Sequence, residues 1–324
     1  LYTLSDFGAV SLLRYQTFTW AIFLQYETAF DRALAAALSL VLVAVAGVLI
    51  LLESKARGSA RYYRSTTGAM KLSSTMSLGV WRWPAFGFVV VVVACSLVAP
   101  LSILGYWAVR GISAGEPVRL IWGAALNSVY GSGLAALVAA IAAIPVVILI
   151  VRYPGRWSGL VEKMSFTGFA LPGIVVALAL IFFSTRYAMP VYQTMFLLIF
   201  AYVVLFLPQA IGTTRASFLQ VNPRFAEAAR SLGKGPNTVL FKITLPLIVP
   251  GILAGMALVF LTAMKELPAT MLLSPLGFDT LATSIWGAAE EAFFAQAAVP
   301  AILLVGVSSI PTAFLILREP RTSV

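Results

Sequence analysis

Few side chains in this sequence could react with or hold a ligand. The 324 residues contain no histidine and one cysteine, Cys95, which lies in an apolar run. Without histidine the chain lacks the usual general base of hydrolytic sites and the commonest metal ligand. Gly233-Lys234 is not part of a phosphate-binding loop, because Ala228 stands where that loop needs its first glycine. The sequence therefore predicts no catalytic residue, no metal site and no cofactor held by this chain.

Charged residues at the ends of apolar segments are the better candidates for binding chemistry. Lys265 and Glu266 directly follow an apolar run, and Asp6 holds the matching place in an internal repeat described below. A charge within a membrane is costly unless it is paired or faces water, and carboxylate oxygens suit hard cations. We predict that Asp6, Lys265 and Glu266 line the outer part of a translocation path. The alternative is an interfacial pair that reaches toward the membrane surface.

The composition is that of a polytopic all-α membrane protein. Hydrophobic residues make up 60% of the chain and charged residues 10%, whereas about one quarter of a soluble domain is charged. The net charge of +10 does not predict a nucleic-acid partner, because the basic residues occupy short segments between apolar runs. Seven runs are long enough to predict spanning helices: 34–52, 85–109, 122–151, 166–183, 194–214, 245–264 and 297–317.

The positive charges predict which side of the membrane each loop faces. Segments 53–84, 152–165, 215–244 and 318–324 hold 6, 3, 5 and 2 Lys and Arg residues, or 16 of the 22 in the chain. Because Lys and Arg are concentrated in cytoplasmic loops, these four segments are predicted to be cytoplasmic. Seven spans then alternate between the two sides without contradiction.

The first sixty residues resemble the last sixty in spacing, hydropathy and charged ends. Internal repeats of this kind place the transport pathway of many transporters at the interface between the repeats. The aligned pieces are residues 4–13 with 264–273, residues 17–22 with 280–285, and Glu27 with Glu290.

The segment between the fifth and sixth apolar runs has the most specific pattern in the chain. It reads E-A-A, three residues, G, nine residues, I, one residue, L-P, and Arg230 directly follows the two alanines. Small alanines let a helix lie close to a partner surface, glycine permits a sharp exit, and proline suits the first turn of a helix. The residues that make up the pattern are Glu227, Ala228, Ala229, Arg230, Gly233, Ile243, Leu245 and Pro246.

This pattern resembles the cytoplasmic coupling loop of the permease subunits of binding-protein-dependent ABC importers. With the two-half layout and the stretches 264–270 and 277–283, it is similar to the fused ferric-iron permeases, with thiamine permeases as close relatives. The resemblance implies a type I importer permease fold in a bacterial inner membrane. It also implies two ATP-binding cassette subunits docked on the inner loops, of which 215–246 is one, a periplasmic substrate-binding protein outside, and alternating access. ATP would be bound by the partner subunits.

The resemblance implies three parts in the chain. Residues 1–56 are expected to be the C-terminal end of a first permease half, 57–84 a cytoplasmic linker, and 85–324 a complete six-helix second half. Because the chain begins with leucine and no signal peptide precedes it, we expect it to be a fragment whose missing first half carries its own coupling loop.

Two other functions remain open from the sequence. The first is the same class of permease with another cargo, thiamine before others. The second is a secondary transporter driven by an ion gradient, a class that usually carries ionisable residues at mid-membrane. The centres of the predicted spans contain no Asp, Glu, Lys or Arg, which favours the ATP-driven class.

Overall fold

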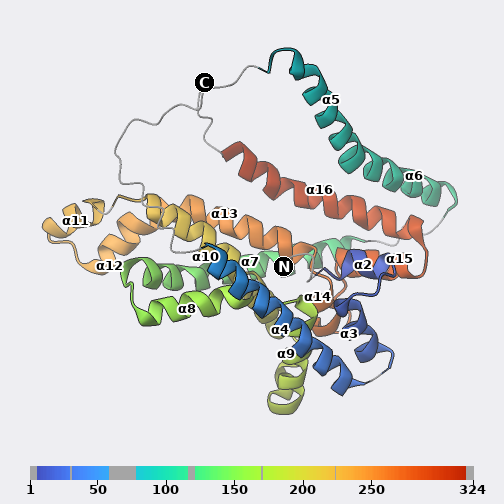
Figure 1. Cartoon of the computed structure of the whole chain (residues 1–324), viewed down its shortest axis with the longest axis horizontal. Helices are drawn as coiled ribbons and strands as arrows, with labels where there is room; N and C mark the ends of the chain where they lie inside the picture. Colours follow the sequence, from blue (N-terminus) through green and yellow to red (C-terminus); the bar gives the residue numbers. More distant parts are fainter. Residues whose placement is uncertain are drawn as a thin grey trace.

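The computed structural model describes residues 6–29, 31–57, 78–115, 121–168, 171–222 and 224–318. These residues form helices and loops, with no strand among them (Figure 1). Most of the predicted linker 57–84 lies outside the described residues. The α-helices are α2 (Gly8–Leu12), α3 (Phe18–Glu27), α4 (Arg32–Arg57), α5 (Arg82–Val93), α6 (Ala99–Ser113), α7 (Trp122–Arg152), α8 (Arg156–Thr167), α9 (Gly173–Tyr187), α10 (Met195–Gln220), α11 (Arg224–Ser231), α12 (Pro236–Val239), α13 (Leu245–Met264), α14 (Pro268–Leu273), α15 (Leu281–Glu290) and α16 (Phe294–Arg318).

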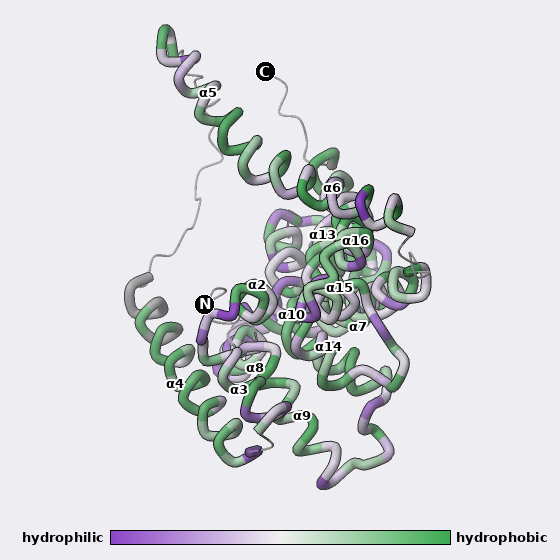
Figure 2. The backbone as a smooth tube through the Cα atoms, turned by 90° about the vertical axis from the view of Figure 1, so that its right-hand side faces the viewer, coloured by the Kyte–Doolittle hydropathy of each residue, from purple (hydrophilic) through white to green (hydrophobic). Residues whose placement is uncertain are grey.

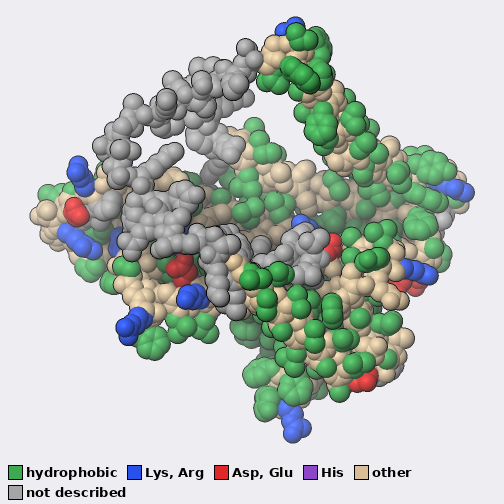
Figure 3. All heavy atoms as spheres, in the orientation of Figure 1, with side chains coloured by type: hydrophobic (Ala, Val, Ile, Leu, Met, Phe, Trp, Pro, Cys, Tyr) green, Lys and Arg blue, Asp and Glu red, His purple; other side chains and the backbone are tan. Residues whose placement is uncertain are grey.

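Six helical stretches among the described residues are long and apolar enough to cross a membrane. They are Arg32–Leu49, Gly79–Ser113, Trp122–Arg152, Met195–Gln220, Pro236–Met264 and Phe294–Leu317. The second runs through α5 and α6 with a π-helical turn, η2 (Ala94–Val98), between them. Figure 2 shows that most residues of the long helices are hydrophobic, and many apolar side chains are exposed on the face seen in Figure 3, as a lipid environment requires.

The predicted span 166–183 is not one continuous helix. Helix α8 ends at Thr167 and α9 begins at Gly173, after Pro172 in an extended conformation. Proline has no backbone N–H and disfavours helix in the residue before it, so the apolar run is broken there. With 15 residues, α9 is about 22 Å long, shorter than the roughly 30 Å of a hydrocarbon core. Segment 152–165, predicted as a loop, contains most of α8.

Helices α7, α10 and α13 pack together as the centre of the fold. The contact face of α7 consists of small residues, with Ala135, Ala139 and Ala143 completely buried. On α13, Gly251 lies so close to α10 that an added Cβ atom would be 2.3 Å from Ser217 Cβ. Because lipid is as apolar as the side chains, helix association in membranes depends on this kind of close packing.

The order of the helices is the one that the predicted repeat requires. Helices α2, α3 and α4 near the start of the chain correspond to α14, α15 and α16 near its end, and α3 and α15 both have 10 residues. Thr17 and Thr280 cap these two helices in the same way, each accepting a hydrogen bond from the backbone N–H three residues on. The two copies meet in space, since α2 packs against α15.

Candidate coupling loop and translocation path

The E-A-A motif forms a short, exposed helix, α11, at one end of the molecule (Figure 1). Its C-terminus is a Schellman motif: Gly233 N–H donates to the Arg230 carbonyl (2.9 Å) and Lys234 N–H to the Ala229 carbonyl (3.1 Å). Gly233 has a φ of +74°, a conformation that other residues adopt only with strain. The predicted sharp exit at Gly233 is therefore confirmed.

The two alanines of the motif face different ways. Ala229 is buried at 6% exposure, and α11 packs against α12 and the π-helical segment η5 (Leu240–Thr244). Glu227, Ala228 and Arg230 are exposed. The expectation that both alanines approach a partner is wrong for Ala229, because its methyl group packs inside the loop. The loop is a folded unit that presents Glu227, Ala228 and Arg230 outward.

The I-x-L-P end of the pattern lies within a continuous helical stretch. The prediction that Pro246 marks the first turn of a new helix is only partly right, because helical structure already begins at Pro236 and continues to Met264. Ile243 and Leu245 are half-buried and Pro246 is exposed. The loop thus continues directly into α13 without a break in helical structure.

Arg152, at the end of α7, contacts the chain on both sides of the loop. Its Nη2 donates a hydrogen bond of 2.9 Å to Thr244 Oγ1, just before α13. Its guanidinium carbon lies 5.6 Å from the ring centre of Phe218, near the end of α10. An ion pair between Arg215 and Glu162 joins α10 to α8. These contacts hold the two ends of the loop to the central helices.

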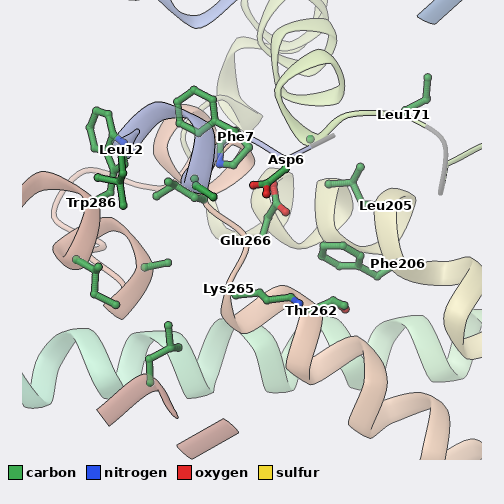
Figure 4. Close-up of a pocket in the computed structure, with 18 of the residues that line it drawn as sticks. Asp6, Phe7, Leu12, Leu171, Leu205, Phe206, Thr262, Lys265, Glu266 and Trp286 are labelled. Atoms are coloured by element: carbon green, nitrogen blue, oxygen red, sulfur yellow. The ribbon is translucent and has the colours of Figure 1, made fainter. Parts of the chain in front are cut away.

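Asp6, Lys265 and Glu266 line a single cavity of about 520 Å³ (Figure 4). The structure therefore brings Asp6 to the same cavity as Glu266, its equivalent in the repeat, although the two residues are 260 positions apart in sequence. Other lining residues come from the middle of α10, Leu205, Phe206 and Gln209 among them. The cavity thus lies between the two copies of the repeat and reaches the centre of the helical core.

The Glu266 side chain is held in a fixed position at this cavity. Its Oε1 accepts a hydrogen bond of 3.3 Å from Ala269 N–H, and the Thr270 hydroxyl donates to the Glu266 backbone carbonyl. An added Cβ on Gly173 would lie 2.3 Å from Glu266 Oε1, so a side chain at this position would displace the Glu266 carboxylate. Glu266 follows the end of α13 and lies outside the spanning helices.

Stability is expected to fall as the pH rises through the range in which Glu266 ionises. Burial raises the pKa of the Glu266 carboxyl from 4.5 to about 7, against the lowering effects of Ala269 N–H and Lys265. The folded protein therefore holds this proton more tightly than the unfolded chain, and that advantage disappears between about pH 4.5 and about pH 7. Thermal unfolding in detergent across this pH range should show the unfolding temperature of the native protein falling as the pH rises. The unfolding temperature of Glu266→Gln should fall less. Glu291→Gln, at an exposed position, should behave like the native protein.

A family model described as "Binding-protein-dependent transport system inner membrane component" matches residues 135–323, which include the coupling loop and the Glu266 side of the cavity. The chain belongs to this family. It is a multi-pass inner-membrane transport component, as its six apolar helical stretches require.

Two relatives of this chain are named for different cargoes. The chain is 39% identical over 320 residues to the Fe(3+)-transport system permease protein FbpB 2 of Haemophilus influenzae, covering 97% of this chain and 63% of the relative. It is 26% identical over 159 residues to the spermidine/putrescine transport system permease protein PotC of Escherichia coli, covering 49% and 58%. The chain thus spans less than two thirds of the length of either relative.

Solved structures of other transporters support the type I permease fold. A bacterial alginate ABC transporter in complex with a periplasmic protein matches 75% of this permease and 97% of that chain, with a TM-score of 0.59 and 16% identity. An amino acid ABC transporter matches 65% and 97%, with a TM-score of 0.50 and 16% identity.

Sequence reasoning missed two features of the site. One is Arg152, which was counted only as a positive charge that sets the orientation. The other is a group of aromatic side chains beside the cavity, from the residue before α2 and from α3 and α15: Phe7, Trp20, Phe23 and Trp286. The repeat contains a signal for the second, because Phe23 and Trp286 are 263 positions apart, as are Thr17 and Thr280.

Proposed function

We propose that this permease imports ferric iron, driven by ATP that two cassette subunits hydrolyse on the cytoplasmic side. A periplasmic binding protein would deliver the cargo to the outer face, and the permease would pass it inward by alternating access. The observation that carries the cargo assignment is the 39% identity to a permease named for Fe(3+) transport, over 97% of this chain. The permease itself would contribute no catalytic residue and hold no cofactor.

The coupling loop supports the ATP-driven mechanism. Helix α11 presents Glu227 and Arg230 to the outside while Ala229 fixes it to the rest of the loop. Arg152 ties both ends of the loop to α7. An ATPase that moved α11 would therefore move α10 and α13 together, and the cavity lies beside both helices.

The chemistry of the cavity is compatible with a cationic cargo. Asp6 and Glu266 supply carboxylates from the two copies of the repeat, and Fe³⁺ is a hard cation that prefers oxygen ligands. Most of the lining is apolar, and Lys265 contributes an opposing charge. This composition suits transient passage, because a permease that retained its cargo would stall.

Uptake measurements test the cargo and the energy source together. A strain lacking this gene, complemented with the full-length gene, should take up radiolabelled ferric iron, and the uncomplemented strain should not. Labelled thiamine serves as the control cargo; restored thiamine uptake without iron uptake would overturn the iron assignment. Uptake that persists after deletion of the ATPase subunits would overturn the ATP-driven mechanism in favour of an ion-coupled one.

A further inference from the structure

The aromatic side chains beside the cavity form a compact layer between two cavities. Phe7 lies at the centre, with its ring centroid 5.0 Å from that of Phe23, 6.2 Å from Trp20 and 6.4 Å from Trp286. Phe23 meets Trp286 edge to face at 5.7 Å, a favourable aromatic geometry. Phe7 and Phe23 are buried, at 1% and 5% exposure. Together the four residues are called the aromatic layer.

One cavity lies on each side of the aromatic layer. The inner cavity is the one that contains Asp6 and Glu266, and Phe7 and Trp286 are in its wall (Figure 4). The outer cavity, of about 980 Å³, has Trp20, Phe23 and Trp286 in its wall. Leu12, Ile285 and Trp286 line both cavities, and the aromatic layer lies where the two cavities meet.

The two cavities lie at different depths along the helices. The inner cavity reaches the middle of α10, whose far end leads into the coupling loop. The outer cavity is lined by Glu27 at the end of α3 and Glu290 at the end of α15, on the side away from that loop. The positive-charge count puts the coupling loop in the cytoplasm. The outer cavity therefore faces the opposite side of the membrane.

The layer is built by both copies of the repeat around their common interface. Phe23 and Trp286 are repeat equivalents, and so are Phe7 and Leu267, which pack in the same apolar cluster. Trp286 is also fixed across the interface, because its Nε1 donates a hydrogen bond of 3.1 Å to Ser11 Oγ. Elements of both copies must therefore separate for the layer to open.

We propose that the aromatic layer of Phe7, Trp20, Phe23 and Trp286 is the closed outer gate of the translocation path. In this state an apolar constriction blocks hydrated ions, because a polar solute cannot enter it without losing its water. Opening requires α2 and α3 to move away from α15, which is the relative motion of the two repeat copies that alternating access demands. This inference rests on the proposed transport function and adds the residues that close its outer side.

Thiol labelling tests the gate without any cargo or ATPase. Cys95 is the only cysteine of these 324 residues, so Cys95→Ser, together with replacement of any cysteine elsewhere in the full-length protein, gives a background for single reporters: Thr262→Cys in the inner cavity and Ala289→Cys in the outer cavity. A membrane-impermeant maleimide is added outside spheroplasts that express the full-length protein. Ala289→Cys should react quickly, and Thr262→Cys should react slowly while the layer is intact.

Removing the layer should expose the inner reporter. Adding Phe23→Ala and Trp286→Ala should speed the labelling of Thr262→Cys by about tenfold or more, because removing the two rings leaves an opening wide enough for water in place of the apolar constriction. Phe196→Ala with Phe200→Ala removes a second aromatic pair, stacked at 6.5 Å on α10 away from the cavities, and should leave the rate unchanged. A milder pair, Phe23→Leu with Trp286→Leu, serves if the alanine pair does not reach the membrane.

The labelling rates decide the proposal independently of the cargo. Fast labelling of Thr262→Cys with the layer intact would overturn it, and so would a rate that the Phe23 and Trp286 changes do not alter. Failure of iron uptake in the native protein would instead overturn the cargo assignment and leave the gate result standing.

Discussion

Uptake is expected to be lost when Glu227→Lys and Gly233→Asp are combined in the coupling loop. Glu227→Lys reverses the charge that α11 presents to its partner, and charge reversal at a docking surface costs enough to weaken binding by about tenfold or more. Gly233→Asp puts a side chain at a φ of +74°, which strains the Schellman turn that ends α11. Together the changes should prevent association with the ATPase subunits. Co-purification of those subunits and uptake of labelled iron are the measurements.

The loop contains its own matched controls. Gly235 lies two residues from Gly233 and is also exposed, but its φ of −65° suits any residue. An added Cβ meets nothing within 4 Å at either glycine, so Gly235→Asp tests the added charge without the strain. It should retain most of the uptake. Gly233→Asn should do the same, because asparagine tolerates the left-handed conformation.

The amount of protein in the membrane separates coupling from folding. The double variant should insert at native levels, because both residues are exposed and outside the spanning helices. Normal uptake by an inserted Glu227→Lys, Gly233→Asp protein would refute the coupling role of the loop.

The features that the sequence predicted correctly depend on short-range physics. The turn at Gly233 follows from the need for a residue that accepts positive φ. The match of α3 to α15 follows from threonine caps and apolar spacing, which both copies retain. The place of Asp6 beside Glu266 followed from the repeat, because equivalent residues of two related halves meet at their interface.

The features that the sequence did not predict depend on tertiary packing. Hydropathy alone does not show where helical structure is interrupted within an apolar run. Predicting the break between α8 and α9 would have required using the helix-breaking effect of Pro172 as well. The inward orientation of Ala229 depends on the path of α12 and η5, which brings them back against α11. The aromatic layer depends on α2 packing against α15, a contact between residues that lie at opposite ends of the chain.

The second large effect is expected where α10 and α13 meet. Gly251→Ala should destabilise the protein by about 1–3 kcal/mol, the usual cost of overpacking a close interface. The added Cβ would lie 2.3 Å from Ser217 Cβ and 2.8 Å from the Thr213 carbonyl oxygen. The carbonyl belongs to the backbone of α10, so no side-chain rotation relieves that contact and the helices must move apart. Thermal unfolding in detergent measures the loss.

Gly212→Ala is the matched control on the facing helix. Gly212 is exposed on α10, and an added Cβ there meets nothing within 4 Å. Because alanine favours helix over glycine by up to about 1 kcal/mol, this change should leave stability equal or slightly higher. Equal unfolding temperatures for Gly251→Ala and the native protein would show that the two helices can separate without cost.

Gly251→Ala should also affect transport, because α10 leads into the coupling loop and α13 leads out of it. Arg152 bridges Phe218 near the end of α10 and Thr244 just before α13, so its two contacts require the helices to stay at their native separation. A Gly251→Ala protein that still binds the ATPase subunits should therefore take up less iron for each ATP hydrolysed. An unchanged ratio of uptake to hydrolysis would mean that the loop moves the permease without the close contact between α10 and α13.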